Sequence, residues 1–176
     1  MPTMSCAAYG KRGKNPARQE SFLVTDELVN MTSLEDFVKT QEFSKIRPDL
    51  LRVLADNLGR MHRSGLNHRD CYICHFLLDA DKALAGEIQL HVIDLHRAQI
   101  RKSVPFRYQV KDVAGILFSS FDIMPSRMEI LKFIRIYSQR KLAIELKENR
   151  RFWNAVEKNA RKLYKKEFGI DAPALR

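Results

Sequence analysis

Two short stretches decide the fold: Asn67-His68-Arg69-Asp70-Cys71-Tyr72-Ile73-Cys74-His75-Phe76-Leu77-Leu78 and Val92-Ile93-Asp94-Leu95-His96. The apolar run 76–78 predicts a strand. Alternation of Ile88, Leu90 and Val92 with polar residues predicts a second strand. The polar connection 79–87 suits a hairpin. Since the residues that flank an antiparallel hairpin are neighbours in space, we expect the loop 68–75 to face Asp94.

This arrangement brings two carboxylates and an imidazole together at the open end of the hairpin. Carboxylate oxygens suit Mg²⁺, and a second carboxylate can accept the proton of an attacking hydroxyl. Asp70, Asp94 and His75 are therefore candidates for phosphoryl-transfer chemistry.

The order of these motifs resembles that of protein kinases, in which H-R-D-x-x-x-x-N precedes a hairpin and a D-F-G motif. Here His75 stands where the asparagine is expected, and Leu95-His96 replace Phe-Gly. An imidazole can ligate a metal through nitrogen, although Mg²⁺ prefers oxygen.

Longer strings extend the resemblance to one family. The segments 67–78 and 92–101, together with 20–28 and 111–120, closely resemble the lipopolysaccharide core heptose kinases, from about Tyr9 to Tyr137. Members of that family transfer the γ-phosphate of ATP to a heptose hydroxyl of the inner core, at the cytoplasmic face of the inner membrane.

The resemblance implies a role for each matching residue. It makes Asp70 the catalytic base, in the loop with His68 and Arg69, and it makes Asp94 a Mg²⁺ ligand with His75 as its partner. It also implies that Asp112 holds the backbone of the loop and that the basic run 97–111 takes the position of an activation segment. From its charge alone, we expect that run to meet phosphate or acidic sugar groups. The hinge that meets the adenine of ATP is expected at Thr25, Asp26, Glu27 and Leu28.

The expected fold is α+β and mostly α, a protein-kinase-like C-terminal lobe over 29–176 with a short β-hairpin. Residues 1–28 are expected to be a remnant of an N-terminal lobe that is largely missing. Gly10-Lys11-Arg12-Gly13 does not match a glycine-rich phosphate loop, and only 24 residues precede Thr25. The segment to Gln19 is predicted to be loop, and Ser21–Leu28 a short buried strand.

Apolar spacing predicts the remaining helices. Ser33 begins a short helix to about Thr40, and a longer one runs from Asp49 to a stop at Gly65. A buried helix is predicted over 112–121, and another starts at the capping box of Ser126. A final helix is predicted over 142–168, with one apolar stripe of Trp153, Val156, Ala160 and Leu163.

The net charge of +10, from 31 basic and 21 acidic residues, indicates an acidic partner such as a phosphorylated substrate, an anionic membrane or nucleic acid. No stretch is long and apolar enough to cross a bilayer, and Met1–Lys14 has no apolar signal region. We therefore expect a cytoplasmic protein. By the resemblance, it acts peripherally at the inner membrane.

The sequence offers three other interpretations. Cys71-Tyr72-Ile73-Cys74-His75 matches the C-x-x-C-H haem signature, but haem attachment belongs with export. The same residues with His68 could ligate zinc, although no second ligand pair is visible, so neither haem nor zinc is expected. The non-enzyme alternative is a basic module that binds an anionic membrane or nucleic acid. No nucleic-acid motif is visible, and nucleic acid is not expected as a partner.

Overall fold

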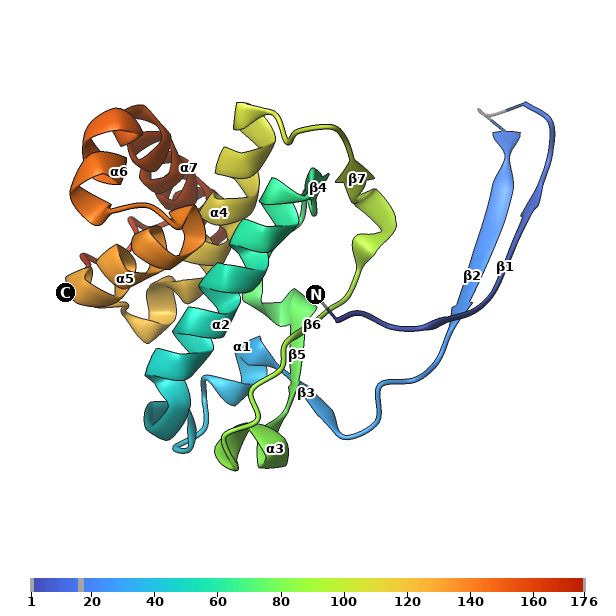
Figure 1. Cartoon of the computed structure of the whole chain (residues 1–176), viewed down its shortest axis with the longest axis horizontal. Helices are drawn as coiled ribbons and strands as arrows, with labels where there is room; N and C mark the ends of the chain where they lie inside the picture. The colour runs from blue at the N-terminus through green and yellow to red at the C-terminus, as the bar shows by residue number, and fades with distance from the viewer. Residues whose placement is uncertain (1, 16–17, 176) are drawn as a thin grey trace.

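A computed structural model describes residues 2–15 and 18–175. The chain is α+β and mostly helical, and Figure 1 shows a helical body from which a two-stranded ribbon projects. No helix in these ranges is long and apolar enough to cross a membrane.

The ribbon pairs β1 (Cys6–Arg12) antiparallel with β2 (Glu20–Thr25). The predicted strand is therefore present, but the prediction that it is buried is wrong, because Phe22 and Leu23 are 62% and 65% exposed. The prediction of loop up to Gln19 is also wrong. A two-stranded ribbon has no second layer to cover either of its faces, so even apolar side chains remain exposed.

A small sheet with the order β3-β5-β6 lies against the helices. It consists of β3 (Met31–Ser33), β5 (Phe76–Asp79) and β6 (His91–Val92), and Phe76 pairs with Val92. This confirms the predicted hairpin, but the second strand is shorter than predicted. Its connection contains a helix, α3 (Ala80–Leu84), which Asp79 caps by accepting from the amide of Lys82.

The first two α-helices of the chain follow β3. Ser33 caps α1 (Leu34–Phe37), as predicted, and α2 (Phe43–Arg63) starts six residues before Asp49. Gly65 follows α2 with φ +84°, a backbone conformation that glycine adopts without strain, so the predicted stop is confirmed.

The other helices follow in the chain. They are α4 (Phe106–Ser120), α5 (Arg127–Ser138), α6 (Leu142–Glu148) and α7 (Arg150–Phe168). Of these, α5 packs on α2 and α7 packs on α4. The capping box at Ser126 is confirmed, whereas α4 starts six residues earlier than predicted and the predicted last helix is two helices. The buried stripe of α7 consists of Phe152, Val156, Ala160 and Tyr164, so the predicted stripe was partly displaced by one residue.

Candidate active site

The H-R-D loop lies between α2 and β5, beside a short antiparallel pair. This pair joins β4 (Leu66–Asn67) to β7 (Gln99–Ile100), and the amide of Arg101 donates to the carbonyl of Gly65 at 2.9 Å. The segment that follows Asp94 therefore folds back onto the start of the loop.

Asp112, on α4, holds the backbone of the loop. Its fully buried carboxylate accepts from the amide of His68 at 2.7 Å and from the amide of Arg69 at 2.8 Å. Arg69 has φ +78°, a conformation that is unfavourable for a residue with a side chain. The carboxylate thus fixes a strained turn immediately before Asp70.

A second buried contact supports Asp112 from behind. His62 Nε2 lies 3.3 Å from the Asp112 carboxylate, and His62 Nδ1 lies 2.7 Å from the hydroxyl of Tyr137. Since a carboxylate only accepts, Nε2 carries a proton, and Nδ1 is the ring nitrogen that pairs with the Tyr137 hydroxyl. Burial, followed by the charge of Asp112, raises the pKa of Tyr137, which stays protonated. A chain of hydrogen bonds thus runs from α5 through α2 and α4 to the loop.

Asp70 is flanked by two cations. Its carboxylate lies 3.0 Å from the guanidinium of Arg97 and 3.3 Å from the amino group of Lys111. Burial opposes the charge of Asp70 and is the largest single effect. The hydrogen bond from Lys111 and the charges of Lys111 and Arg97 outweigh it, so the pKa of Asp70 lies below its usual value. Asp70 is an ionised carboxylate at neutral pH.

His75 connects the two carboxylate-bearing segments. Its Nδ1 lies 2.7 Å from the backbone carbonyl oxygen of Asp70, and its Nε2 lies 3.4 Å from Asp94 Oδ2. Because a carbonyl only accepts, Nδ1 carries a proton, and Nε2 is the ring nitrogen that faces Asp94. The ring stacks on His68 at 5.4 Å between centroids. Burial lowers the pKa of His68, which favours its neutral form.

Asp94 begins the short turn 95–97 with φ +60° and ψ +46°. One of its oxygens hydrogen-bonds His96, and the other faces His75. Within residues 2–15 and 18–175, no group of three or more His, Cys, Asp or Glu side chains could hold a metal. Two protein ligands are nevertheless enough for Mg²⁺, which usually keeps several waters and binds substrate phosphates as well. Asp94 and His75 therefore fit such an ion.

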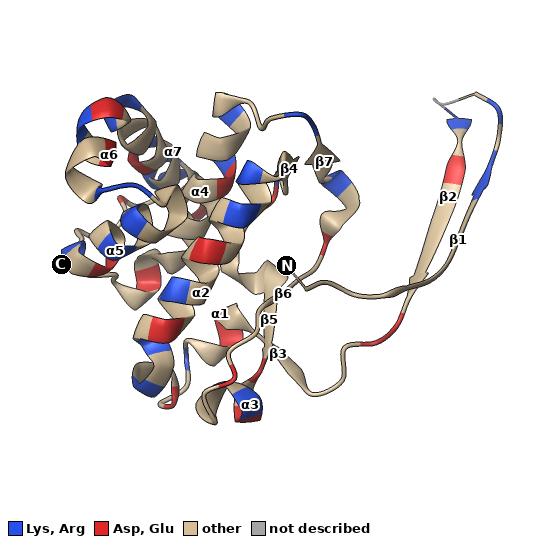
Figure 2. Cartoon of the chain, viewed as in Figure 1, with Lys and Arg blue, Asp and Glu red and all other residues tan. Residues whose placement is uncertain are grey.

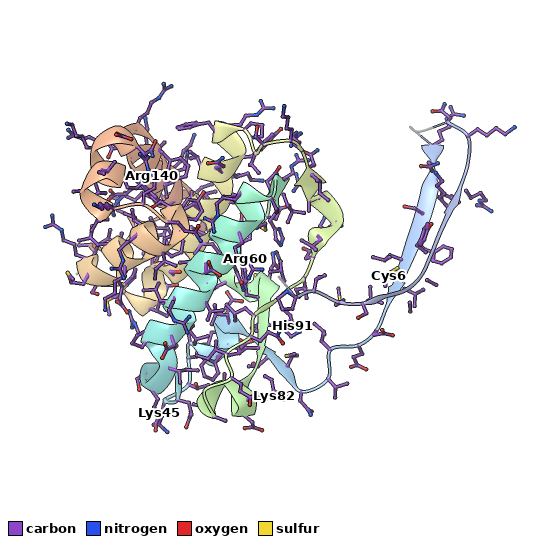
Figure 3. All side chains as sticks on the ribbon, viewed as in Figure 1. Cys6, Lys45, Arg60, Lys82, His91 and Arg140 are labelled. Carbon is purple, nitrogen blue, oxygen red and sulfur yellow. The ribbon has the colours of Figure 1, made fainter. Side chains whose placement is uncertain are left out.

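The loop cysteines are unfavourable zinc ligands. Cys71 is buried and Cys74 is half-buried, while Cys6 lies on the distant ribbon (Figure 3). Burial raises the pKa of the Cys71 and Cys74 thiols, which disfavours the thiolate that zinc requires.

The four predicted hinge residues lie in the connection between the ribbon and the body (Figure 1). Thr25 ends β2, and the amide of Asp26 donates to the carbonyl of Ser5 at 3.0 Å. Across the described chain, no hydrogen bond or ion pair joins residues 25–28 to Asp70 or Asp94, in contrast to the predicted residues 68–75 and 94, which the fold brings together.

Comparison with known proteins shows the family of the chain. The model of the lipopolysaccharide kinase (Kdo/WaaP) family matches residues 1–137. The chain belongs to the lipopolysaccharide kinase (Kdo/WaaP) family. This confirms the resemblance found in the sequence.

Individual members of the Kdo/WaaP family are closely similar. The chain is 45% identical over 170 residues to lipopolysaccharide core heptose(I) kinase WaaP of Pseudomonas aeruginosa, and 37% identical over 166 residues to the protein of the same name from Escherichia coli. These matches cover 94% and 92% of the chain but 63% of each relative, so the chain spans less than two thirds of their length.

A solved structure shares the fold. The structure titled "WaaP in complex with acyl carrier protein" matches with a TM-score of 0.84 and 44% identity, over 93% of this chain and 70% of that chain.

Sequence reasoning missed two residues of the site, His62 and Tyr137, and did not connect Arg97 and Lys111 with Asp70. His62 and Tyr137 occupy positions that look like ordinary core positions of α2 and α5. A polar residue one position from an apolar helical stripe was the signal available at His62, since it needs a buried partner.

Proposed function

We propose that this chain transfers the γ-phosphoryl group of ATP to a heptose hydroxyl of the lipopolysaccharide inner core. The observation that carries the proposal is the ionised Asp70, held on a fixed loop beside the pair of His75 and Asp94. The heptose(I) kinase relatives supply the acceptor class.

In this mechanism Asp70 accepts the proton of the attacking hydroxyl. A lowered pKa keeps the carboxylate free of a proton at neutral pH, so it is ready to act as the base. Arg97 and Lys111 orient it, and their positive charge favours an approaching phosphoryl group. His68 and Arg69 contribute through their amides, which Asp112 anchors.

Asp94 would hold Mg²⁺ through an oxygen and His75 would do so through Nε2. Bound there, the ion neutralises charge on the phosphates of ATP. The oxygen that would bind it is Oδ2, which faces His75, while Oδ1 hydrogen-bonds His96.

We further propose that residues 29–176 form a protein-kinase-like C-terminal lobe and that residues 1–28 belong to the nucleotide-covering side. The backbone of Thr25, Asp26, Glu27 and Leu28 would meet adenine there. The exposed apolar side chains of the ribbon, Phe22 and Leu23 among them, support contact with further structure on that side.

The partners proposed are the anionic acceptor at the cytoplasmic face of the inner membrane and, from the solved relative, an acyl carrier protein. A charge of +10 favours contact with acidic surfaces of both kinds. The alternative of a non-catalytic basic module is not favoured, because the named relatives are kinases.

Calorimetric titration with a nonhydrolysable ATP analogue and Mg²⁺ tests the nucleotide site. We expect Asp94→Asn to weaken binding at least about tenfold, because loss of even a hydrogen-bonded partner of a metal ligand costs about 10- to 100-fold. Asp81→Asn, an exposed carboxylate on α3, serves as the control with the same charge change. Equal affinities of the Asp94 variant and the parent would reject the metal role.

Transfer of labelled γ-phosphate to an inner-core acceptor tests the base. We expect Asp70→Asn to lower kcat by about 10²- to 10⁴-fold, the usual contribution of a general base. Nucleotide affinity should stay unchanged in this variant, since Asp70 is not assigned to the metal. A fully active Asp70 variant would contradict the mechanism.

A further inference from the structure

A cluster of arginines surrounds one aromatic ring next to the catalytic loop. The guanidinium carbons of Arg69, Arg101 and Arg107 lie 5.9, 5.0 and 4.6 Å from the centroid of the Tyr108 ring. We refer to these four residues as the arginine cluster. Figure 2 shows basic residues along the segment from β7 into the first turns of α4, where three of the four lie.

The arginine cluster has no acidic counterpart. In the part of the chain that the structure describes, none of its three arginines forms an ion pair with a carboxylate, whereas Arg97 and Lys111 pair with Asp70. The segment 95–111 contains no acidic residue. Three cations that share one ring repel one another, and an aromatic face balances charge only weakly. The cluster is therefore suited to an anion.

The cluster is joined directly to the loop that carries Asp70. Arg101 donates to the side-chain oxygen of Asn67 at 3.2 Å, and Arg69 immediately precedes Asp70. Two donors of these residues, Asn67 Nδ2 and Arg69 Nε, are buried without a hydrogen-bond partner among the described residues. Buried donors normally have an acceptor, and oxyanions supply several.

We propose that the arginine cluster is an acceptor subsite that binds an acidic group, a sugar carboxylate or a sugar phosphate, adjacent to the hydroxyl that is phosphorylated. This inference rests on the proposed function and deepens it by naming the chemistry of the acceptor. The planar forks of Arg101 and Arg107 match the two oxygens of a carboxylate or phosphate. Tyr108 holds these side chains in place, since Arg107 also donates to its hydroxyl at 2.8 Å.

The arginine cluster is separate from the two cations that pair with Asp70. Arg97 and Lys111 contact the base itself, so an acidic group bound by them would compete with Asp70 for their charge. The arginine cluster contacts the loop through Arg69 and Asn67 instead. An anion bound by the cluster therefore leaves the ion pairs of Asp70 with Arg97 and Lys111 intact. An acidic group held there positions the acceptor without discharging the base.

The test is an NMR titration of the full chain with three sugars: glucuronate, glucose 6-phosphate and neutral glucose. A saturating nonhydrolysable ATP analogue with Mg²⁺ occupies the nucleotide site throughout. The phosphate of glucose 6-phosphate therefore cannot bind there and give a false signal. The variant is R101Q with R107Q. The control is K158Q with K162Q, which removes two charges from exposed positions on α7.

We expect both acidic sugars to bind the parent and the α7 control, and glucose to bind neither. The arginine variant should lose at least about tenfold in affinity for the acidic sugars, the effect of one charge-assisted contact. The tighter of the two acidic sugars identifies the group that the site recognises. Equal loss in the control, unchanged binding in the arginine variant, or equal binding of glucose would overturn the proposal.

R107Q alone keeps the test valid if the double variant misfolds. Arg107 is exposed, and in the described structure it forms no hydrogen bond with the loop, so its replacement should leave the fold intact. The single variant should show part of the loss. Binding of the ATP analogue, recorded in the same samples, reports on the proposed function separately. Retained nucleotide binding without acidic-sugar binding refutes the subsite alone, whereas the reverse result refutes the nucleotide site.

Discussion

The strongest stability prediction concerns the buried carboxylate of Asp112. It accepts two backbone amides, those of His68 and Arg69, and a third hydrogen bond comes from His62 at 3.3 Å. Asp112→Asn keeps the shape of the side chain but replaces one acceptor oxygen with an NH₂ donor. That donor then faces a backbone N–H in either orientation, that of Arg69 or that of His68, and beside His68 it also faces Nε2 of His62.

The magnitude follows from these contacts. A hydrogen bond to a charged group contributes about 1.5–3 kcal/mol, and a buried donor left unpaired costs about 1–3 kcal/mol. The neutral amide costs less to bury than a carboxylate, which offsets part of the loss. We therefore expect Asp112→Asn to lower the free energy of unfolding by about 2–4 kcal/mol, a large share of the 5–15 kcal/mol typical of a domain. The released loop should also lose at least about tenfold in phosphoryl transfer.

Urea unfolding followed by circular dichroism measures the first effect, and labelled-phosphate transfer measures the second. Asp122→Asn is the matched control, because Asp122 is exposed and accepts one hydroxyl, that of Tyr164 at 2.7 Å. The control should change stability by less than about 0.5 kcal/mol. An Asp112 variant as stable as this control would refute the view that the carboxylate anchors the loop.

Three further variants probe the surroundings of the site. Tyr137→Phe removes a hydroxyl that contacts a buried imidazole nitrogen and should destabilise the fold by about 1–2 kcal/mol in the same urea assay. Gly65→Ala should destabilise more than Gly86→Ala, since both have positive φ but only the Gly65 variant places a methyl group 1.8 Å from a backbone oxygen just past β7; equal thermal midpoints would contradict this. Lys111→Met should raise the pKa of Asp70, as followed by carboxyl ¹³C shifts against pH. Because the pKa of Asp70 is depressed in the fold, the stability that its pairing contributes is present above the unfolded value and is lost as the pH falls through the folded one.

The order of motifs along the chain predicted that the loop 68–75 faces Asp94, and the structure confirms this proximity. Hairpin pairing alone requires that the segments before β5 and after β6 meet, and His75 and Asp94 indeed lie 3.4 Å apart. The family resemblance added the anchoring role of Asp112, with which its two amide contacts agree. The first feature depends on one short-range pairing, which a single sequence can reveal. The second joins Asp112 to amides 44 and 43 residues away, so it needed the resemblance.

The ribbon could not be predicted in the same way. Phe22, Leu23 and Val24 form an apolar run of the kind that buried strands have, and nothing in the run states whether a covering layer exists. Burial depends on what packs against a strand, which lies outside the strand's own sequence. The same limit applies to Arg97 and Lys111, whose common partner Asp70 becomes apparent only when the chain folds back through β7.

The proposed mechanism gives two carboxylates different tasks, and their surroundings differ accordingly. Asp112 is fully buried and accepts from two backbone amides of the loop and from His62, so its charge stabilises the backbone of the loop. Asp70 is partly exposed, and its partners are two long cationic side chains that solvent and a phosphoryl group can draw away. A base must be able to change partners during the reaction, whereas an anchor must not. The rigid carboxylate therefore lies beneath the loop and the adaptable one at its surface, in the arrangement that proton transfer at a fixed position requires.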